Sequence, residues 1–254
     1  MADSPPIDRL SPAQIWQLRR LTTPTVYNGW ELVTRHDPAR DGFNLEPTVD
    51  FAPTLGPVAG RAITLVVRVG GPAPVDNRER WARFRQHVAD RQDEPKLLVV
   101  QDLDKPMLYG SVFGEVAAAT FRSLGCVGAI IDGGLRDVDE TRAAGFKVLA
   151  RRACVGHGVG ALVSFGEPVE VFGRRIKPGQ LVHTDQHGFL AIPPEDEPRL
   201  LEAAGFLDAI EAGLLVAARA AGGKPIDAFL QQFDSAIDAY VSAARSRFPK
   251  RGEW

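Results

Sequence analysis

Three charged side chains in the middle of the chain have the types and spacing of a small-molecule site. Twenty residues separate Glu115 from Arg136, which is followed directly by Asp137. Carboxylate oxygens are the ligands that Mg²⁺ and Mn²⁺ prefer, whereas the planar guanidinium of arginine matches a carboxylate. We therefore expect a divalent cation at Asp137 and Glu115, and a small anionic substrate at Arg136.

The elements expected around these residues would bring them to one crevice. The spacing of apolar residues predicts a helix over 112–124, and β-branched content predicts a buried strand over 127–132. The glycines at 133 and 134 then indicate a turn. Because open α/β sheets bind ligands at the carboxyl ends of their strands, we expect the site at that edge of the sheet.

The start of the expected helix adds a second attraction for an anion. The N–H groups of a first helical turn have no partner within the helix, and the helix dipole is positive at this end. We therefore expect Gly114, Val116 and Ala117 to take part in substrate binding.

Purely structural roles remain open for the same residues. Asp137 and Glu140 have the spacing of a capping box, with Asp137 capping a helix over 137–145. Glu115 is suited to complementing a helix dipole, and Asp132 to shaping the turn. Capping and metal ligation by Asp137 are compatible, because a carboxylate has two oxygens.

Other motifs are weaker. His183, Asp185 and His187 alternate as metal ligands on a strand would, but turn residues follow Asp185, so we do not expect a metal there. The glycine-rich segment 156–160 has no evident helix after it and does not predict a dinucleotide site. No histidine is an evident base, and we expect a water molecule in this role.

Composition excludes several classes of protein. The chain has 254 residues, of which 44% are hydrophobic, and this suffices for a substantial core. A net charge of -2 and dispersed basic residues give no positive field for nucleic acid. No apolar run reaches the roughly 18 residues of a membrane span, and the N-terminus carries no targeting signal. We expect a cytoplasmic protein with no nucleic-acid or membrane partner, and we expect Cys126 and Cys154 to be small buried hydrophobic residues.

Strands alternating with helices predict a layered α/β fold with a mainly parallel sheet. Strands are expected over 62–69, 96–103, 127–132 and 147–151, and helices over 11–22, 75–92, 112–124 and 137–145. Turn residues divide 159–193 into a run of hairpins, and residues 35–60 are expected to be irregular.

Two helices are expected after Pro194, the second over 225–247 with an apolar stripe along one side. Another surface must cover this apolar stripe, either in this subunit or in a neighbouring one. We expect residues 1–195 to form one α/β domain, with residues 196–254 as a helical extension packed on that domain or on a neighbouring subunit.

The middle of the chain resembles the family of the regulator of ribonuclease activity A. The resemblance is carried by Gly114-Glu115, the twenty-residue gap, IDGGLRD at 131–137, and KPGQLVHTDQHGFLAIP at 177–193. Enzymatic members of this RraA-like family are 4-hydroxy-4-methyl-2-oxoglutarate and 4-carboxy-4-hydroxy-2-oxoadipate aldolases, many of which also decarboxylate oxaloacetate. Those aldolases often carry Asp where this chain has Glu115.

The resemblance implies a layered α/β/α, swivelling-type domain with a mixed sheet, assembled as a homotrimer or homohexamer. It implies a metal-dependent lyase that cleaves carbon–carbon bonds of 2-oxo acids through a metal-stabilised pyruvate enolate. Arg136 would hold the substrate, and Asp137 would carry Mg²⁺ or Mn²⁺ with Glu115 contributing. An acid such as Glu31 would come from a neighbouring subunit. The alternatives are a non-catalytic regulator that binds a ribonuclease or another protein, and a lyase of this scaffold for a different hydroxy or keto acid.

Overall fold

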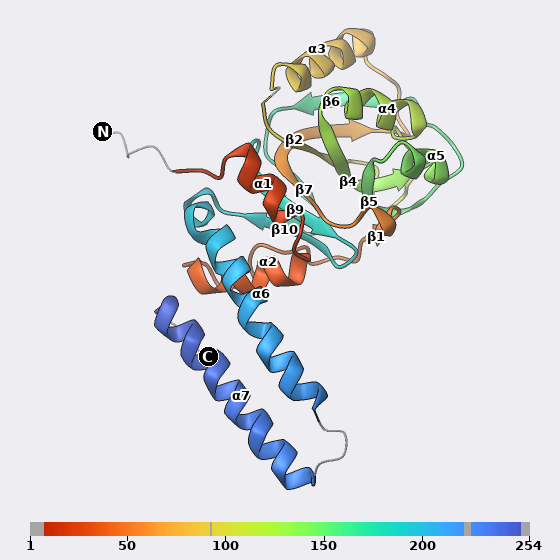
Figure 1. Ribbon diagram of the computed structural model, residues 1–254. Helices are drawn as coiled ribbons and strands as arrows, with labels where there is room; N and C mark the ends of the chain where they lie inside the picture. Colours follow the sequence, from red (N-terminus) through yellow and green to blue (C-terminus); the bar gives the residue numbers. More distant parts are fainter. Residues whose placement is uncertain (1–7, 92, 221–224, 250–254) are drawn as a thin grey trace.

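A curled, mixed β-sheet forms the centre of the protein (Figure 1). The computed structural model describes residues 8–91, 93–220 and 225–249. The strand order is β1-β5-β4-β3-β2-β9-β10, and β6 pairs with β2 beside this path. Strands β2, β3, β4 and β5 run parallel to one another, whereas β1, β6, β9 and β10 pair antiparallel. The bounds are β1 Val49–Asp50, β2 Val58–Arg68, β3 Lys96–Asp102, β4 Cys126–Leu135, β5 Lys147–Ala153, β6 Ala161–Phe165, β9 Leu181–Asp185 and β10 Gly188–Ile192.

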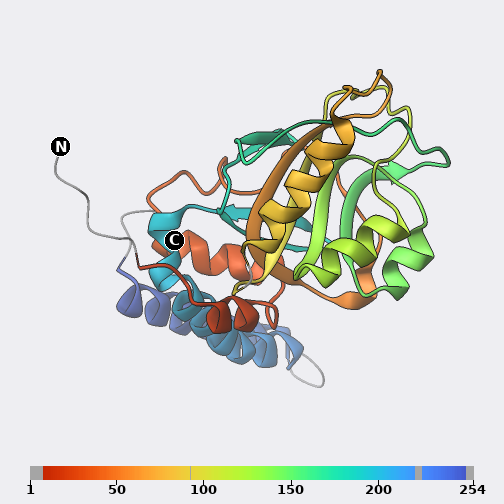
Figure 2. The same ribbon diagram turned by 90° about the horizontal axis from the view of Figure 1, so that it is seen from above.

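The two faces of the sheet bury alternate residues of the same strands, as the two-residue period of a strand requires. One face carries Leu65, Leu98 and Ile131 and is covered by helices. These helices are α3 Asn77–Ala89, α4 Glu115–Ser123 and α5 Val138–Ala143 (Figure 2). The other face carries Leu97 and Ile130 and packs against a two-stranded sheet, β7 Val169–Val171 and β8 Arg174–Ile176, and against β9 and β10. The mixed α/β fold is confirmed, with β-structure rather than helices on the second face.

A third core joins the two ends of the chain. It packs α1 Pro12–Leu18, α2 Thr23–Val33 and α6 Glu197–Arg219 against β9 and β10. The α2–α6 approach is close, because a Cβ at Gly29 would overlap the backbone of Ala204. The buried carboxylate of Glu197 accepts a hydrogen bond from Arg61 Nη1 at 2.6 Å. This ion pair fixes the start of α6 to strand β2.

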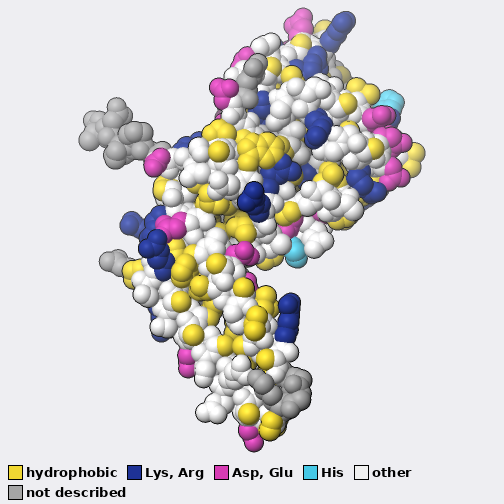
Figure 3. Space-filling model, in the orientation of Figure 1, with side chains coloured by type: hydrophobic (Ala, Val, Ile, Leu, Met, Phe, Trp, Pro, Cys, Tyr) yellow, Lys and Arg dark blue, Asp and Glu magenta, His cyan; other side chains and the backbone are white. Residues whose placement is uncertain are grey.

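The outer half of α6 and α7 Ile226–Arg247 form a hairpin that projects from this body (Figure 1). Ala244 is the buried residue of α7, so this chain leaves most of the apolar stripe of α7 uncovered, and cover by a neighbouring subunit stays a prediction. Large apolar side chains remain exposed along both helices, as Figure 3 shows. They are Leu215, Val216, Ile226, Leu230 and Ile237. Residues 250–254, at the end of the predicted helical extension, lie outside the described residues.

Several boundaries differ from those expected. The helix predicted over 112–124 begins only at Glu115, because residues 111–114 cross the end of β4 in an irregular segment. Strand β4 continues through the two glycines to Leu135, with a bulge in its pairing to β5, so the turn expected there is wrong. The helix predicted over 11–22 begins after Ser11 as expected but ends at Leu18. Residues 35–60 include β1, the start of β2 and a 3₁₀ turn, Pro53–Leu55.

Other expectations are confirmed or refined. Strand β6 pairs with β2 and does not form a hairpin, whereas β7–β8 and β9–β10 are hairpins. Cys126 is buried, and this burial raises the pKa of its thiol to about 12, while Cys154 is only partly buried. None of the helices in the described ranges is both long and apolar enough to cross a bilayer.

Candidate active site

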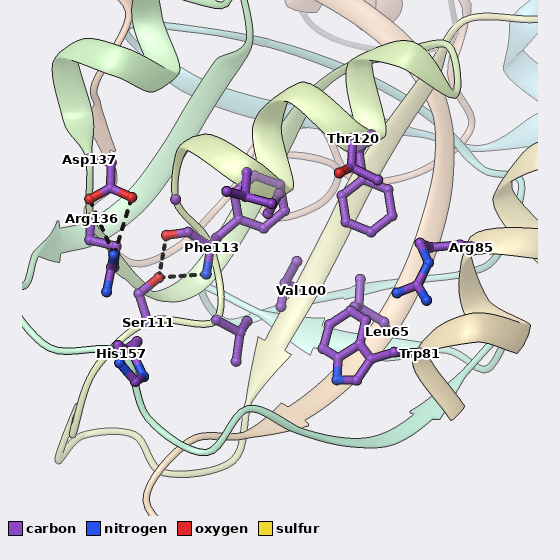
Figure 4. Close-up of a pocket in the computed structure, with 15 residues that line it drawn as sticks. Leu65, Trp81, Arg85, Val100, Ser111, Phe113, Thr120, Arg136, Asp137 and His157 are labelled. Atoms are coloured by element: carbon purple, nitrogen blue, oxygen red, sulfur yellow. Dashed lines mark hydrogen bonds and ion pairs between the residues drawn. The ribbon is translucent and has the colours of Figure 1, made fainter. Parts of the chain in front are cut away.

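A cavity of about 500 Å³ lies between α3 and α4, over strands β2 and β3, and reaches the carboxyl end of β4. Figure 4 shows its polar end, where Ser111, Arg136, Asp137 and His157 gather. The sequence predicted a site at the carboxyl edge of the sheet, and the cavity does reach that edge. It also extends along the groove between two helices, which the sequence did not indicate.

Asp137 is fixed by two neighbours at this polar end. Both of its carboxylate oxygens lie 3.2 Å from Nε of Arg136. Its Oδ2 also accepts a hydrogen bond, 3.2 Å long, from the backbone N–H of Glu115, the first residue of α4. The positive end of the α4 dipole therefore faces this carboxylate. The sequence pattern of Glu115, Arg136 and Asp137 is thus brought together in space, with Glu115 participating through its main chain.

The backbone of Asp137 is strained. Its φ of 52° and ψ of 52° lie in the left-handed region, which costs a residue with a Cβ roughly 1–2 kcal/mol, although Asp tolerates it better than most. Such outliers persist where surrounding structure enforces them, and they gather at functional sites. Here Arg136 Nε and the N–H of Glu115 hold the carboxylate, and Gly114 lies so close to it that a Cβ at this position would overlap Asp137 Oδ2. Gly114 makes room for the carboxylate.

The capping box expected at Asp137 and Glu140 is not formed. Asp137 does occupy the N-cap position of α5, but its side chain makes no capping hydrogen bond. The left-handed backbone turns the carboxylate away from α5 and toward Arg136 and the start of α4. A capping role therefore does not explain this residue.

Asp132 also has a different role from the one expected. It is fully buried within β4 and binds the side chains of Lys105 and Arg151. Its Oδ2 accepts a further hydrogen bond from the N–H of Phe172. Asp132 therefore joins three segments of the core beneath the site and shapes no turn.

Arg136 is placed to receive an anion. Its backbone N–H donates to the carbonyl of Phe113 at 3.2 Å, which ties the end of β4 to the segment before α4. Ser111 supports the same segment, since its hydroxyl lies 2.7 Å from the carbonyls of both Phe113 and Gly134. Only Nε of the guanidinium bonds to Asp137, and within the described part of the chain its two Nη groups have no hydrogen-bond partner. They are available to a substrate carboxylate.

The donors for a cation are few. Asp137 is the only acidic residue among those described that line the cavity. No cluster of three His, Cys, Asp or Glu side chains with metal-ligand geometry occurs in residues 8–91, 93–220 and 225–249. Glu115 is exposed and its side chain does not line the cavity. Mg²⁺ typically keeps several waters and uses one or two carboxylates together with substrate oxygens, so this donor set suits such an ion and not a closed zinc site.

The remaining predicted residues lie close to the polar end. Gly114, Val116 and Ala117 all line the cavity. Val116 is 79% exposed, so this apolar side chain borders the cavity and is not buried against the sheet. Ala118 and Phe121 are the residues of α4 that are buried.

Among the polar lining residues, sequence reasoning missed Arg85, Ser111, Thr120 and His157. Trp81 of α3 is half-buried; it packs against the core and also lines the cavity. His157 belongs to the glycine-rich segment 156–160, which contacts the segment before α4 through a bridge between Ser111 and His157. The glycines were a signal that this loop approaches another backbone closely, although not one that identified its partner.

The histidines of the β9–β10 hairpin are structural. His183 is fully buried between the Thr23 hydroxyl and the carbonyl of Leu18, and burial lowers its pKa to about 4. Asp185 accepts the backbone N–H of Thr23 and binds His187. These contacts account for the alternating motif without a metal.

Glu31 lies in α2, and it does not line this subunit's cavity. It is close enough to Tyr240 of α7 to add to the rise in the pKa of that phenol, which is caused first by burial. Its expected contribution to a neighbouring subunit stays a prediction.

Comparison with known proteins decides the family. Residues 34–191, well over half of the chain, match the family described as RraA-like, Aldolase/RraA. The protein belongs to the RraA-like family. This family includes aldolases as well as RraA regulators, and membership confirms the resemblance seen in the sequence.

Individual relatives of this RraA-like protein are distant. It is 29% identical over 110 residues to an uncharacterized protein of Methanocaldococcus jannaschii, covering 42% of this chain and 52% of that one. It is 26% identical over 98 residues to a putative 4-hydroxy-4-methyl-2-oxoglutarate aldolase of Halalkalibacterium halodurans, covering 37% and 45%. The matches thus span about half the length of these curated relatives.

A solved structure shows the same fold. The crystal structure of Streptomyces coelicolor RraAS2, described as an unusual member of the RNase ES inhibitor RraA protein family, superposes with a TM-score of 0.61. The two sequences are 21% identical, and the match covers 82% of this chain and 98% of that chain. At this identity the likeness supports the RraA-like fold.

Proposed function

We propose that this protein is a divalent-metal-dependent lyase that cleaves a carbon–carbon bond of a 2-oxo acid and releases pyruvate. The observation that carries the proposal is the Asp137 carboxylate, held in a strained backbone at a cavity mouth by Arg136 Nε and by the N–H of Glu115. Asp137 occupies the N-cap position of α5, but its side chain makes no capping hydrogen bond there. A carboxylate held on a strained backbone suits a cation, and the neighbouring arginine with free Nη groups suits an anionic substrate.

Asp137 would hold Mg²⁺ or Mn²⁺, with Glu115 as the neighbouring carboxylate. A cation bound there would supply Lewis acidity toward the 2-oxo group of the substrate. Arg136 binds the substrate carboxylate through its Nη groups and stabilises negative charge as it develops. The first-turn N–H groups of α4 at Val116 and Ala117 face the same anion.

Two reactions use the same arrangement. In retro-aldol cleavage the substrate's 4-hydroxyl loses a proton, the C3–C4 bond breaks, and its electron pair forms pyruvate enolate. In decarboxylation of oxaloacetate, the C3–C4 bond breaks with loss of carbon dioxide and leaves the same enolate. In both cases C3 then takes up a proton. A water, or the imidazole of His157 at the polar end of the cavity, carries these protons.

A coupled assay for pyruvate tests the proposal. Oxaloacetate and a panel of 4-hydroxy-2-oxo acids are offered to the full chain with Mg²⁺, with Mn²⁺ and with excess chelator. We expect turnover that requires metal and that falls by roughly 100-fold or more in Asp137→Asn, because both the metal carboxylate and its charge are lost. Full activity in chelator, or an Asp137→Asn variant as active as the parent, would refute the mechanism.

The regulator function is the competing proposal, since the RraA-like family also includes RraA regulators. The observation in its favour is the projecting α6–α7 hairpin, whose exposed Leu215, Val216 and Ile226 offer an apolar surface. Binding of a ribonuclease or another protein through this hairpin would survive chelator and the Asp137→Asn change. A homotrimer or homohexamer stays part of the proposal, and sedimentation of the full chain measures it.

A further inference from the structure

The cavity is long, and its two ends differ in chemistry. Arg136, Asp137 and His157 lie at one end, whereas Trp81 and Arg85 of α3 lie at the other (Figure 4). The proposed lyase reaction uses only the first end. A short 2-oxo acid bound by Arg136 would leave the α3 end of the 500 Å³ cavity unused.

The middle of the cavity is apolar. Its walls include Leu65, Val100 and Phe121, which are at most 4% exposed in the structure. The indole of Trp81 is fixed by a hydrogen bond of 2.9 Å from Nε1 to the carbonyl of Gly160, and it is half-buried. A fixed aromatic wall favours stacking with another ring or contact with an apolar chain. A polar substrate tail would lose hydration here, and the hydroxyl of Thr120 is the polar side-chain group that this part of the lining offers it in return.

Arg85 ends this apolar stretch with a positive charge. It is exposed, and no carboxylate of the described residues forms an ion pair with it. The neighbouring arginines of α3 differ, because Arg80 and Arg83 both pair with Asp76. A guanidinium at a cavity rim without a protein partner is suited to a planar anion such as a carboxylate.

We propose that the substrate is a 2-oxo acid with an apolar, preferably aromatic, segment and a terminal carboxylate. The 2-oxo acid end binds at Arg136, the apolar segment lies against Trp81 and Phe121, and the terminal carboxylate binds Arg85. This inference rests on the proposed function for the orientation of the substrate. It distinguishes this chain from aldolases of short, polar 4-hydroxy-2-oxo acids, whose substrates have no apolar segment to fill the middle of the cavity.

Binding of matched probes tests this assignment without relying on turnover. Isothermal titration calorimetry compares pyruvate, phenylpyruvate and 4-carboxyphenylpyruvate on the full chain with Mg²⁺. We expect phenylpyruvate to bind at least about tenfold more tightly than pyruvate because its ring is buried. The added carboxylate should give roughly a further fivefold, the scale of a partly exposed ion pair.

Variants of α3 separate the contribution of the aromatic ring to binding from that of the terminal carboxylate. Arg85→Gln should remove the gain from the terminal carboxylate and leave phenylpyruvate unchanged, while the control Arg83→Gln, on the same helix, changes neither. Trp81→Leu should weaken both aromatic probes but not pyruvate, and Trp81→Phe should restore much of the loss. Thermal unfolding of each variant checks that the fold is retained.

The inference is overturned if pyruvate binds but the aromatic probes bind no better, or if Arg85→Gln does not distinguish the two aromatic probes. The lyase proposal fails separately, if oxaloacetate and the 4-hydroxy-2-oxo acids give no metal-dependent pyruvate. If the aromatic probes bind in an Arg85-dependent way but no turnover is found, the assignment of the binding site stands and the lyase reaction is refuted.

Discussion

The backbone N–H of Glu115 donates a hydrogen bond to the carboxylate of Asp137, although twenty-one residues lie between them. The contact joins the first turn of α4 to the end of β4, and both segments line the cavity (Figure 4). The acidic side chain of Glu115, by contrast, is exposed and outside the cavity lining. The main chain and the side chain of this residue can therefore be tested independently.

Comparing Glu115→Pro with Glu115→Gln separates the contribution of the backbone N–H from that of the carboxylate side chain. Proline is tolerated at the first position of a helix but has no N–H, so Glu115→Pro should free Asp137 Oδ2. We expect Glu115→Pro to lower kcat for pyruvate release by about tenfold, the scale of one lost hydrogen bond to a charged group. Glu115→Gln keeps the N–H and should change kcat less, unless the side chain ligates the metal. In that case metal affinity falls, which titration of activity with Mg²⁺ measures.

Gly114→Ala should damage the site with little damage to the fold. The backbone of Gly114 is extended, so alanine is not strained there, but its Cβ would overlap Asp137 Oδ2 and lie 3.1 Å from Cγ of Arg136. Displacing both groups should lower kcat/KM by roughly 100-fold, as small misplacements in active sites do.

Gly213→Ala is the matched control for that change. Gly213 lies in α6, and its added Cβ meets no heavy atom within 4 Å. Alanine is a better helix former than glycine by about 1 kcal/mol, so this variant should unfold at slightly higher temperature with unchanged turnover. Equal activity in the two variants would show that Gly114 does not position Asp137.

His157 offers a test of proton transfer. The proposed reaction needs a group that accepts and returns a proton, and His157 is the imidazole among the described lining residues. If it has this role, His157→Gln should lower kcat for pyruvate release by about 100-fold or more. The control His36→Gln removes an imidazole that pairs with Glu195 away from the cavity and should leave kcat unchanged. A parental kcat in His157→Gln would assign the proton transfer to water.

The buried His183 predicts a loss of stability in acid. Its pKa is lowered to about 4 by burial, whereas the unfolded chain has a histidine pKa near 6.5. Between these values the unfolded state binds the extra proton, so the free energy of unfolding falls as pH decreases from 6.5 to 4 and is fully retained above 6.5. The loss should be about 1.4 kcal/mol per pH unit from this residue. Urea unfolding at pH 7 and pH 5 measures it.

His183→Gln provides the comparison. The variant loses the hydrogen bonds to Thr23 and Leu18 and should be less stable than the parent at pH 7. Its free energy of unfolding should also differ less between pH 7 and pH 5, because the folded and unfolded states no longer differ by the proton of this histidine. An unchanged difference would mean that other groups control acid stability.

The sequence by itself determined the local elements and the family. The β-branched runs of β2 to β5, Ser11 before α1 and the Arg136-Asp137 pair after an apolar strand were all recognisable, because they depend on neighbours a few residues away. The alternation of strands and helices likewise predicted a layered α/β fold with a mainly parallel sheet.

Only the tertiary structure decided what those residues contact. Asp137 was equally suited to capping α5, and its left-handed backbone with the close approach of Gly114 turned it toward Arg136 and α4 instead. Trp81, Arg85 and His157 reach the cavity from α3 and from a distant loop. Sequence periodicity reports which side of a helix is apolar, but a cavity forms where separate elements leave space between them, and that depends on how all of them pack.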